Sequence, residues 1–292
     1  MVDERLRSIF KEGSKTYYNS TIFFRREVKE DVFKLYAFVR VADDLVDSIP
    51  QRVEEFYRLK ERFHAALEGE EVDDIVISSF VELYRRKGFQ REWVEAFLHS
   101  MEMDLGTRSY QTMDDLQVYL YGSAEVVGLM MARIMDLPES SYPYAQHLGR
   151  AMQYINFIRD IQEDIRLGRS YFPQEELLRY GLPDLKESTV RMHPEMFKQF
   201  VRAQIRRYME WQRIAERGYA EIPRRDLVAI KTAADMYKFT ATKIYSRPMR
   251  VFHKKVKPSL GRIMIGYSRN RLWPLAYRQC PARGRIKGDY DE

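Results

Sequence analysis

Two segments of the chain carry polar and charged residues at helical spacing inside an otherwise apolar sequence. The first covers residues 32–47 and reads VFKLYAFVRVADDLVD. At about 100° per residue, four of its polar side chains share one stripe of a helix: Tyr36, Arg40, Asp43 and Asp47. Apolar residues fill nearly every other direction, which is typical of a buried helix. A buried charge is costly unless it is paired, hydrogen-bonded or bound to a metal, so this stripe requires a partner.

The second segment covers residues 151–173 and reads AMQYINFIRDIQEDIRLGRSYFP. Its polar stripe consists of Gln153, Asn156, Asp160 and Asp164. Two predicted helices that lie far apart in the sequence therefore each present a file of carboxylates from an apolar body. If the two files face each other, their like charges repel strongly at low dielectric constant. A positive group must then lie between them.

Three kinds of positive group are compatible with these residue types. Arginine side chains could pair with the aspartates, and Arg40 and Arg159 are close enough in sequence to do so. A redox di-metal site in a four-helix bundle uses Glu-x-x-His pairs, but no histidine follows the carboxylates of either file at that spacing. Hard cations such as Mg²⁺, or Mn²⁺ in its place, prefer carboxylate oxygens and share their coordination with water and substrate phosphates. This third alternative fits the aspartate pairs best.

The absence of nucleotide-binding motifs, together with the polar and aromatic residues that are present, indicates the class of substrate. Neither G-x-x-x-x-G-K-[ST] nor G-x-G-x-x-G occurs, so no nucleotide-binding loop is indicated. Phosphate donors would then be side chains, such as Arg40, Arg169 and Tyr171. A helical cavity with aspartates at its mouth and apolar walls suits a hydrocarbon chain that ends in a diphosphate. The 16 Phe and 20 Tyr residues also suit allylic carbocations, which aromatic faces stabilise.

Helical periodicity dominates the rest of the chain, and alternating strand patterns bounded by turns are absent. Gly, Pro, Ser and Asp signals separate the periodic segments. The predicted helices cover residues 3–12, 29–48, 52–67, 73–86, 90–105, 113–135, 142–165, 194–220, 224–245 and 250–271. The sequence therefore predicts one all-α domain, followed by a polar tail at 273–292 that we expect to be flexible.

The amino-acid composition limits the classes of protein to which the chain can belong. With 45% hydrophobic residues over 292 positions, the chain can bury a sizeable core. Its single cysteine, Cys280, excludes an internal disulfide framework and suits a reducing compartment. No apolar run approaches the roughly 18 residues of a membrane span, and the first residues lack the apolar core of a signal peptide. We therefore expect a cytoplasmic protein.

The formal net charge is +6, and basic residues gather in the C-terminal third. Such a surface could bind nucleic acid, an anionic membrane or a phosphate-bearing substrate, or could simply be solvated. Because the cations are not interleaved with aromatic residues as in single-strand binders, no nucleic-acid partner is expected. Peripheral contact with a membrane is left open, and no obligate protein partner is predicted.

Residues from about Ser14 to about Phe252 resemble the squalene and phytoene synthases, the head-to-head prenyl transferases, and in particular their phytoene/dehydrosqualene branch. The resemblance rests on SKTYY (14–18), YAFVRVADDLVD (36–47), YLYGSAEVVG (119–128), QYINFIRDIQEDIRLGRSYFP (153–173), AADMY (233–237) and RVFHKK (250–255). Two aspartate motifs with matching Arg, Gln, Asn and Tyr neighbours are a far more specific signal than one D-D-x-x-D. A chain-elongating prenyl transferase would need a second D-D-x-x-D, and NFIRDIQED is not one; a terpene cyclase would also fit DDLVD alone.

The resemblance implies an isoprenoid-synthase-type helical bundle around a central cavity, formed by residues 1–272. It implies that Mg²⁺ ions clamp two prenyl diphosphates, and that the allylic cation left by one is captured by the double bond of the other. The resulting cyclopropylcarbinyl diphosphate ionises, rearranges and loses a proton. The favoured reaction converts two geranylgeranyl diphosphates to phytoene. The alternatives are dehydrosqualene or squalene synthesis from two farnesyl diphosphates, or an inactive prenyl-diphosphate-binding protein. NADPH is not expected, because no C-terminal apolar anchor like that of squalene synthases is seen.

The resemblance also implies roles for individual residues. The implied metal ligands are Asp43, Asp47, Asn156, Asp160 and Asp164. The implied catalytic groups are the four aspartates, Arg40 and Tyr237. The implied substrate-binding residues are Ser14, Thr16, Tyr36, Arg40, Tyr119, Gln153, Asn156, Arg159, Arg169, Tyr171 and Arg250. Ser14 and Thr16 could equally be helix caps.

The sequence departs from the family pattern at Glu125, where many relatives have glycine. On an apolar helix, this carboxylate either pairs with a nearby arginine or adds a polar group to the cavity. We favour pairing. For Tyr121, on the same predicted helix, a structural role is expected.

Overall fold

The computed structural model describes residues 3–13, 18, 21, 23–253 and 255–272. Ser14, Thr16 and the tail at 273–292, for which the sequence makes predictions, lie outside the described residues. Within the described ranges the chain is helical, and its β-contact is an isolated bridge between Ser109 and Ser170. The prediction of an all-α fold is confirmed.

Long helices carry the fold and short helical turns connect them. In chain order the elements are α1 (Glu4–Gly13), α3 (Arg26–Asp47), α4 (Val53–Glu68), α5 (Ile75–Lys87), α6 (Arg91–Gly106), α7 (Met113–Leu120), η1 (Tyr121–Glu125), α8 (Val126–Ile134), η2 (Glu139–Ser141), α9 (Tyr142–Arg166), α10 (Gln174–Arg179), α11 (Glu187–Met192), α12 (Pro194–Glu216), η3 (Arg217–Glu221), α13 (Arg224–Ser246), η4 (Pro248–Phe252) and α14 (Leu260–Leu272). Of the η segments, η1 is a π-helix and the others are 3₁₀-helices.

The predicted helix at residues 250–271 is wrong in its first half. The chain forms η4, residues 255–259 have no regular structure, and α14 begins only at Leu260. Pro258 explains the break, because proline lacks an N–H and its ring clashes with the carbonyl group four residues earlier. The sequence also missed the short helices α10 and α11. The other predicted ranges agree with the structure to within four residues at each end, apart from the π-helical turn η1 inside one of them.

Local signals set several helix ends. The carboxylate of Asp74 caps α5 by accepting hydrogen bonds from the N–H groups of Val76 at 2.9 Å and Ile77 at 3.3 Å. Gly69 and Gly88 end α4 and α5 in left-handed conformation, with φ of 100° and 60°. Helices α3 and α9 are longer, at 22 and 25 residues, and they carry the two polar stripes.

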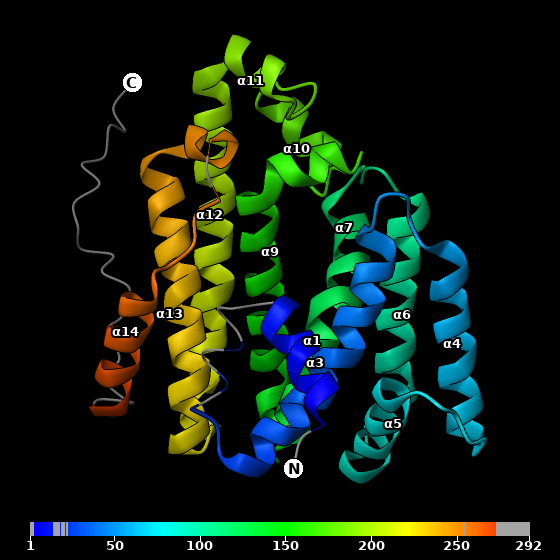
Figure 1. Ribbon diagram of the computed structural model, residues 1–292. Coiled ribbons are helices and arrows are strands. Elements are labelled where there is room, and N and C mark those ends of the chain that lie inside the picture. The colour runs from blue at the N-terminus through cyan, green and yellow to red at the C-terminus, as the bar shows by residue number, and fades with distance from the viewer. Residues whose placement is uncertain (1–2, 14–17, 19–20, 22, 254, 273–292) are drawn as a thin grey trace.

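The helices build two large apolar cores, and Tyr219, Leu227 and Ala234 form a small third cluster. One core consists mainly of α1, α3, α4, α5, α6 and α8, and the other mainly of α7, α9, α12 and α13. Figure 1 shows α3 to α6 on one side and α9, α12 and α13 on the other, with α10 and α11 across one end. Both α8 and α12 pack along α9, so α9 lies at the centre of the bundle.

Two glycines allow close helix crossings next to α9. A Cβ atom added at Gly122 in η1 would lie 2.1 Å from the carbonyl oxygen of Ala96 in α6. One added at Gly149 in α9 would lie 2.2 Å from the carbonyl oxygen of Ala124 in η1. Both distances are far shorter than a real contact, so only glycine fits at these crossings.

Candidate active site

A cavity of about 850 Å³ lies between helices of the two cores. Both polar stripes line it: Tyr36, Arg40, Asp43 and Asp47 from α3, and Gln153, Asn156, Asp160 and Asp164 from α9. Much of the remaining wall is apolar and includes Phe24, Phe97, Met101, Met131 and Leu148. The cavity therefore combines a carboxylate-rich region with an apolar body.

The carboxylate files lie at the C-terminal ends of their helices. Asp47 is the last residue of α3, and Asp164 lies in the last turn of α9. Arg169, just beyond α9, donates a hydrogen bond to Asp47, so the two helix ends are adjacent. A helix C-terminus carries a partial negative charge, which adds to the charge of the aspartates. The combined potential favours a cation at this end of the cavity.

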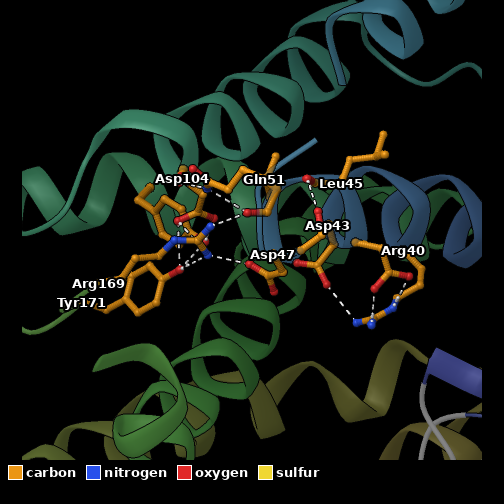
Figure 2. Close-up of polar contacts among 12 residues, drawn as sticks. Arg40, Asp43, Leu45, Asp47, Gln51, Asp104, Arg169 and Tyr171 are labelled. Carbon is orange, nitrogen blue, oxygen red and sulfur yellow. Dashed lines mark hydrogen bonds and ion pairs between the residues drawn. The ribbon is translucent and has the colours of Figure 1, made fainter. Parts of the chain in front are cut away.

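Arginines neutralise part of the first file, as Figure 2 shows. Arg40 Nη1 donates to Asp43 Oδ2 at 2.9 Å, and Arg40 also pairs with Asp44. Arg169 Nη1 donates to Asp47 Oδ1 at 2.5 Å. The guanidinium of Arg169 is buried, whereas the side chain of Asp47 is 40% exposed, so water screens this contact from one side only.

The second file is neutralised less completely. Arg159 Nε donates to Asp160 Oδ1 at 2.9 Å, and Lys255 Nζ lies 3.1 Å from the same oxygen. Lys255 also pairs with Glu163. Within the described part of the chain, Asp164 forms no ion pair with a basic side chain. The arginine pairing considered from the sequence is thus present at Arg40 and Arg159, but it does not reach every aspartate.

Asp104 on α6 belongs to the site and was missed by the sequence reasoning. It is 2% exposed and lines the cavity. Its Oδ2 accepts a hydrogen bond from the Tyr119 hydroxyl at 2.6 Å, and its Oδ1 accepts one from the Tyr171 hydroxyl at 2.8 Å. Arg169 Nη1 lies 3.7 Å from Asp104 Oδ1. Asp104 therefore orients two tyrosines directly, and it also contacts Arg169, the basic group that pairs with Asp47.

A signal for Asp104 was available in the sequence. Phe97, Met101 and Asp104 recur at spacings of four and three residues, so they share one face of α6, and all three are buried. The same wheel argument that identified the two files would have identified this carboxylate. The loop that follows α9 is held beside α6 by a hydrogen bond from the Ser170 N–H to the Arg108 carbonyl oxygen at 2.9 Å, and this places Tyr171 against Asp104.

Desolvation and mutual repulsion raise the pKa of three carboxyl groups in the cavity. Loss of water contact, and then the charge of Asp47, raises the pKa of Asp43 to about 7. Desolvation, and then the charge of Asp160, raises the pKa of Asp164 well above its ordinary value. Desolvation raises the pKa of Asp104 to about 6. These shifts mean that nearby positive charge does not fully compensate the ionised carboxylates.

The donor set fits a hard cation. Asn156 Oδ1 is buried without a hydrogen-bond partner, and Asn156 lies on the cavity wall with the carboxylates of α9. An amide oxygen in this position is a suitable ligand for Mg²⁺. Among the described residues, no three His, Cys, Asp or Glu side chains are arranged to hold a metal ion by themselves. Mg²⁺ does not require such a cage, because one or two carboxylates together with water and substrate phosphates usually hold it.

The other residues singled out from the sequence divide into two groups. The cavity lining includes Tyr119, Arg159, Arg169, Tyr171 and Tyr237. Arg250 in η4 is half-buried and is not part of that lining. The structure thus brings together every described residue of the predicted site except Arg250.

Glu125 is not among the residues that line the cavity. Arg150 Nε donates to Glu125 Oε1 at 2.6 Å, and the two side chains are only 16% and 3% exposed. The Arg150 guanidinium also lies 5.3 Å from the ring centre of Trp211. The prediction that Glu125 pairs with an arginine is confirmed.

Comparisons with known proteins agree with this geometry. Residues 10–262 match the family described as squalene/phytoene synthase. The chain is 27% identical to the chloroplastic phytoene synthase of Narcissus pseudonarcissus over 94% of its own length and 68% of that protein. It is 26% identical to the 15-cis-phytoene synthase of a Paracoccus species, over 94% of this chain and 91% of the relative.

The fold is similar to that of a dehydrosqualene synthase solved in complex with a ligand, with a TM-score of 0.83 and 22% identity over 94% of this chain and 96% of the other. The helical bundle around a central cavity is therefore of the isoprenoid-synthase type. From this fold, from the two aspartate files on one cavity and from a family match over most of its length, the chain belongs to the squalene/phytoene synthase family.

Proposed function

We propose that this protein is a Mg²⁺-dependent prenyl transferase that condenses two prenyl diphosphates head to head through a cyclopropylcarbinyl diphosphate. Its proposed main reaction converts two geranylgeranyl diphosphates to phytoene with release of diphosphate. The observation that carries the proposal is the cavity, which joins both aspartate files to an apolar body. Family membership and the phytoene synthases among the relatives support the reaction class and the product.

The polar end of the cavity binds and orients the diphosphates in this proposal. Asp43, Asp47, Asp160, Asp164 and Asn156 would hold Mg²⁺, which when bound supplies Lewis-acid charge to the departing diphosphate. The basic side chains on the same wall are Arg40, Arg159, Arg169, Lys255 and Lys257. Their guanidinium and ammonium groups donate charge-assisted hydrogen bonds to phosphate oxygens. They also stabilise the negative charge that develops as the leaving group departs.

The apolar body holds the prenyl chains and excludes water from the cation. Aromatic faces lie next to the polar end: the rings of Phe157 and Tyr171 stack with centres 4.2 Å apart, and Tyr119 lies 5.1 Å from Tyr171. Such faces stabilise an allylic cation. Because Asp104 accepts hydrogen bonds from both tyrosine hydroxyls, it holds the two rings in place.

The test is turnover by the purified full chain. Geranylgeranyl diphosphate and farnesyl diphosphate are supplied separately, each with Mg²⁺ or with chelator and each with or without NADPH, and organic extracts are examined by mass spectrometry. We expect metal-dependent phytoene from geranylgeranyl diphosphate without NADPH. Dehydrosqualene from farnesyl diphosphate alone would replace the proposed substrate, and squalene that requires NADPH would replace the product class. Binding of both diphosphates without turnover would show an inactive binding protein and refute the proposal.

A further inference from the structure

Helix α12 carries polar side chains on the face that packs along α9. None of the described helices is long and apolar enough to span a membrane, and the long helix α12 even buries polar groups inside the bundle: Gln204 is 2% exposed. Gln204 forms a polar cluster, called the clamp below, with Arg207 on the same helix, Tyr154 on α9 and Glu176 on α10. Tyr154 and Glu176 are buried as well. None of these four residues lines the cavity, so the clamp lies outside the site described above.

The clamp is a closed network of hydrogen bonds between three helices. Arg207 binds Glu176 through both Nη atoms, with Nη2 donating to Oε1 at 2.5 Å and Nη1 donating to Oε2 at 2.8 Å. The Tyr154 hydroxyl accepts from Arg207 Nη1 at 2.9 Å and donates to Gln204 Oε1 at 2.5 Å. Gln204 Nε2 completes the network by donating to Glu176 Oε2 at 3.0 Å. Each member therefore bonds to at least two others, and a polar network that is satisfied in this way holds its helices in one arrangement.

Stability alone is a weak reason for such a network. Replacing a buried ion pair by apolar residues of similar volume is often neutral or stabilising, but apolar contacts lack the directional geometry of hydrogen bonds. Helix α10 is 6 residues long, and a helix this short is not stable by itself, so contacts with its neighbours must hold it. Its buried residues are Glu176 and Leu177. The clamp therefore supplies the directional contacts that set the position of α10.

The position of α10 matters because of the segment that leads into it. Residues 167–173 join α9 to α10 and carry two residues of the candidate active site, Arg169 and Tyr171. Figure 2 shows Arg169 against Asp47 and Tyr171 against Asp104. Any shift of the segment would move both contacts together.

The segment is held at both ends. At its start, the Arg169 N–H donates to the carbonyl oxygen of Asp164, in the last turn of α9, at 2.9 Å. At its end, the ring of Phe172 packs edge-on against the ring of Tyr154, with the ring centres 5.9 Å apart, and Glu176 ties α10 to the clamp. Tyr154 thus belongs to the clamp through its hydroxyl group and contacts the segment through its ring.

We infer that the clamp is a positioning device for the active site, which holds segment 167–173 so that Arg169 and Tyr171 meet the cavity carboxylates. It acts through α10 and the ring of Phe172 and makes no contact with substrate. A misplacement of about 1 Å in a binding group can cost about a hundredfold in rate, so a contact outside the cavity can control the site. The effect on turnover rests on the proposed function, whereas the effect on the segment does not.

The test variant is Glu176→Gln, which removes the charge that Arg207 binds and keeps the volume of the side chain. The first measurement is amide hydrogen exchange at Arg169 and Ser170 in the full chain without ligand, and we expect exchange about tenfold or more faster than in the wild type. The second is calorimetric affinity for Mg²⁺ with inorganic diphosphate, which we expect to fall on the order of tenfold. Neither measurement depends on turnover.

The matched control is Asp31→Asn. Asp31 accepts hydrogen bonds from both Nη atoms of Arg86 at 2.5 and 3.1 Å, and its side chain is 8% exposed, compared with 7% for Glu176. This pair joins α3 to α5, and Asp31 lies about three helical turns before Asp43. The control should lower the free energy of unfolding as the test variant does, but it should leave both measurements as in the wild type. A merely structural clamp would make the two variants behave alike.

A milder second variant is Tyr154→Phe, which removes the hydroxyl group and keeps both the ring and the ion pair of Arg207 with Glu176. It should shift both measurements in the same direction by about fivefold, as expected for one hydrogen bond, and it replaces Glu176→Gln if that variant does not fold. Thermal unfolding shows at which temperature each variant is folded.

Three results would overturn the inference. They are exchange at Arg169 and Ser170 that stays at the wild-type rate in the clamp variants, equally faster exchange in the Asp31→Asn control, and faster exchange with unchanged affinity for diphosphate. A wild type that binds no diphosphate would instead refute the proposed function, and the exchange rates would still decide whether the clamp holds the segment.

Discussion

The close crossing between α9 and η1 allows a prediction with a magnitude taken from the structure. In Gly149→Ala, the new Cβ would lie 2.2 Å from the carbonyl oxygen of Ala124, and the neighbour is backbone that cannot rotate away. Real Cβ contacts begin at 3.0 Å or more, so the two helices must separate by about 0.8 Å. Overpacking of this kind costs about 1–3 kcal/mol, and a backbone neighbour places it at the upper end. Alanine has a higher helix propensity than glycine, which raises the free energy of unfolding by about 1 kcal/mol. The net decrease in the free energy of unfolding is therefore about 2 kcal/mol.

Urea unfolding followed by circular dichroism measures this loss as a lower midpoint at unchanged slope. Gly106→Ala is the control for an added methyl group without a clash, because nothing lies within 4 Å of the added Cβ at this last residue of α6. The control should be as stable as the wild type or slightly more stable. Gly149 and Ala124 both line the cavity, so the separation should also lower turnover, on the order of tenfold to a hundredfold. If Gly149→Ala unfolds at the same urea concentration as Gly106→Ala, the crossing is not as tight as the structure indicates and the reasoning is wrong.

Three further predictions concern charge. Asp164→Asn should abolish turnover without lowering the free energy of unfolding, since it removes repulsion with Asp160; a destabilised variant that keeps its turnover would contradict the assigned role. Mg²⁺ with inorganic diphosphate at about 100 times its dissociation constant should stabilise the wild type by about 2.7 kcal/mol in thermal unfolding, and Asp164→Asn should lose most of this gain. Glu125→Gln should cost about 1–3 kcal/mol, because the partly buried Arg150 loses its charged partner, whereas Glu125→Gln with Arg150→Met should lie closer to the wild type in a double-mutant cycle.

The parts of the site that the sequence predicts correctly are those set by helical periodicity. Residues four and seven positions apart share a helix face whatever surrounds the helix. The alignment of Arg40, Asp43 and Asp47 on one wall of the cavity was therefore readable in advance, and so was the alignment on α9. That the two stripes share one cavity was only a condition in the argument from sequence, and the structure supplies it.

Contacts between different helices could not be predicted from the sequence, because no local pattern encodes them. Asp104 meets Tyr119 and Tyr171 across 15 and 67 residues, and its own segment gives only a carboxylate on a buried face. The pairing of Arg169 with Asp47 spans 122 residues and depends on how the loop after α9 folds back. The close approach of Gly122 in η1 to Ala96 in α6 is likewise a contact between elements that no local pattern encodes.

The sequence presents arginine pairing and metal binding as alternatives, but the two are compatible in this cavity. Arg40, Arg169 and Arg159 reach Asp43, Asp47 and Asp160, so each neutralises one carboxylate of a file. Asp164 has no such ion pair within the described chain, and desolvation together with Asp160 and Asp47 raises its pKa well above the usual range. In the proposed function a diphosphate adds further negative charge at the same place, so we expect a bound cation where the ion pairs do not reach. We expect this cation near Asp164 and Asn156 Oδ1, which is buried without a hydrogen-bond partner.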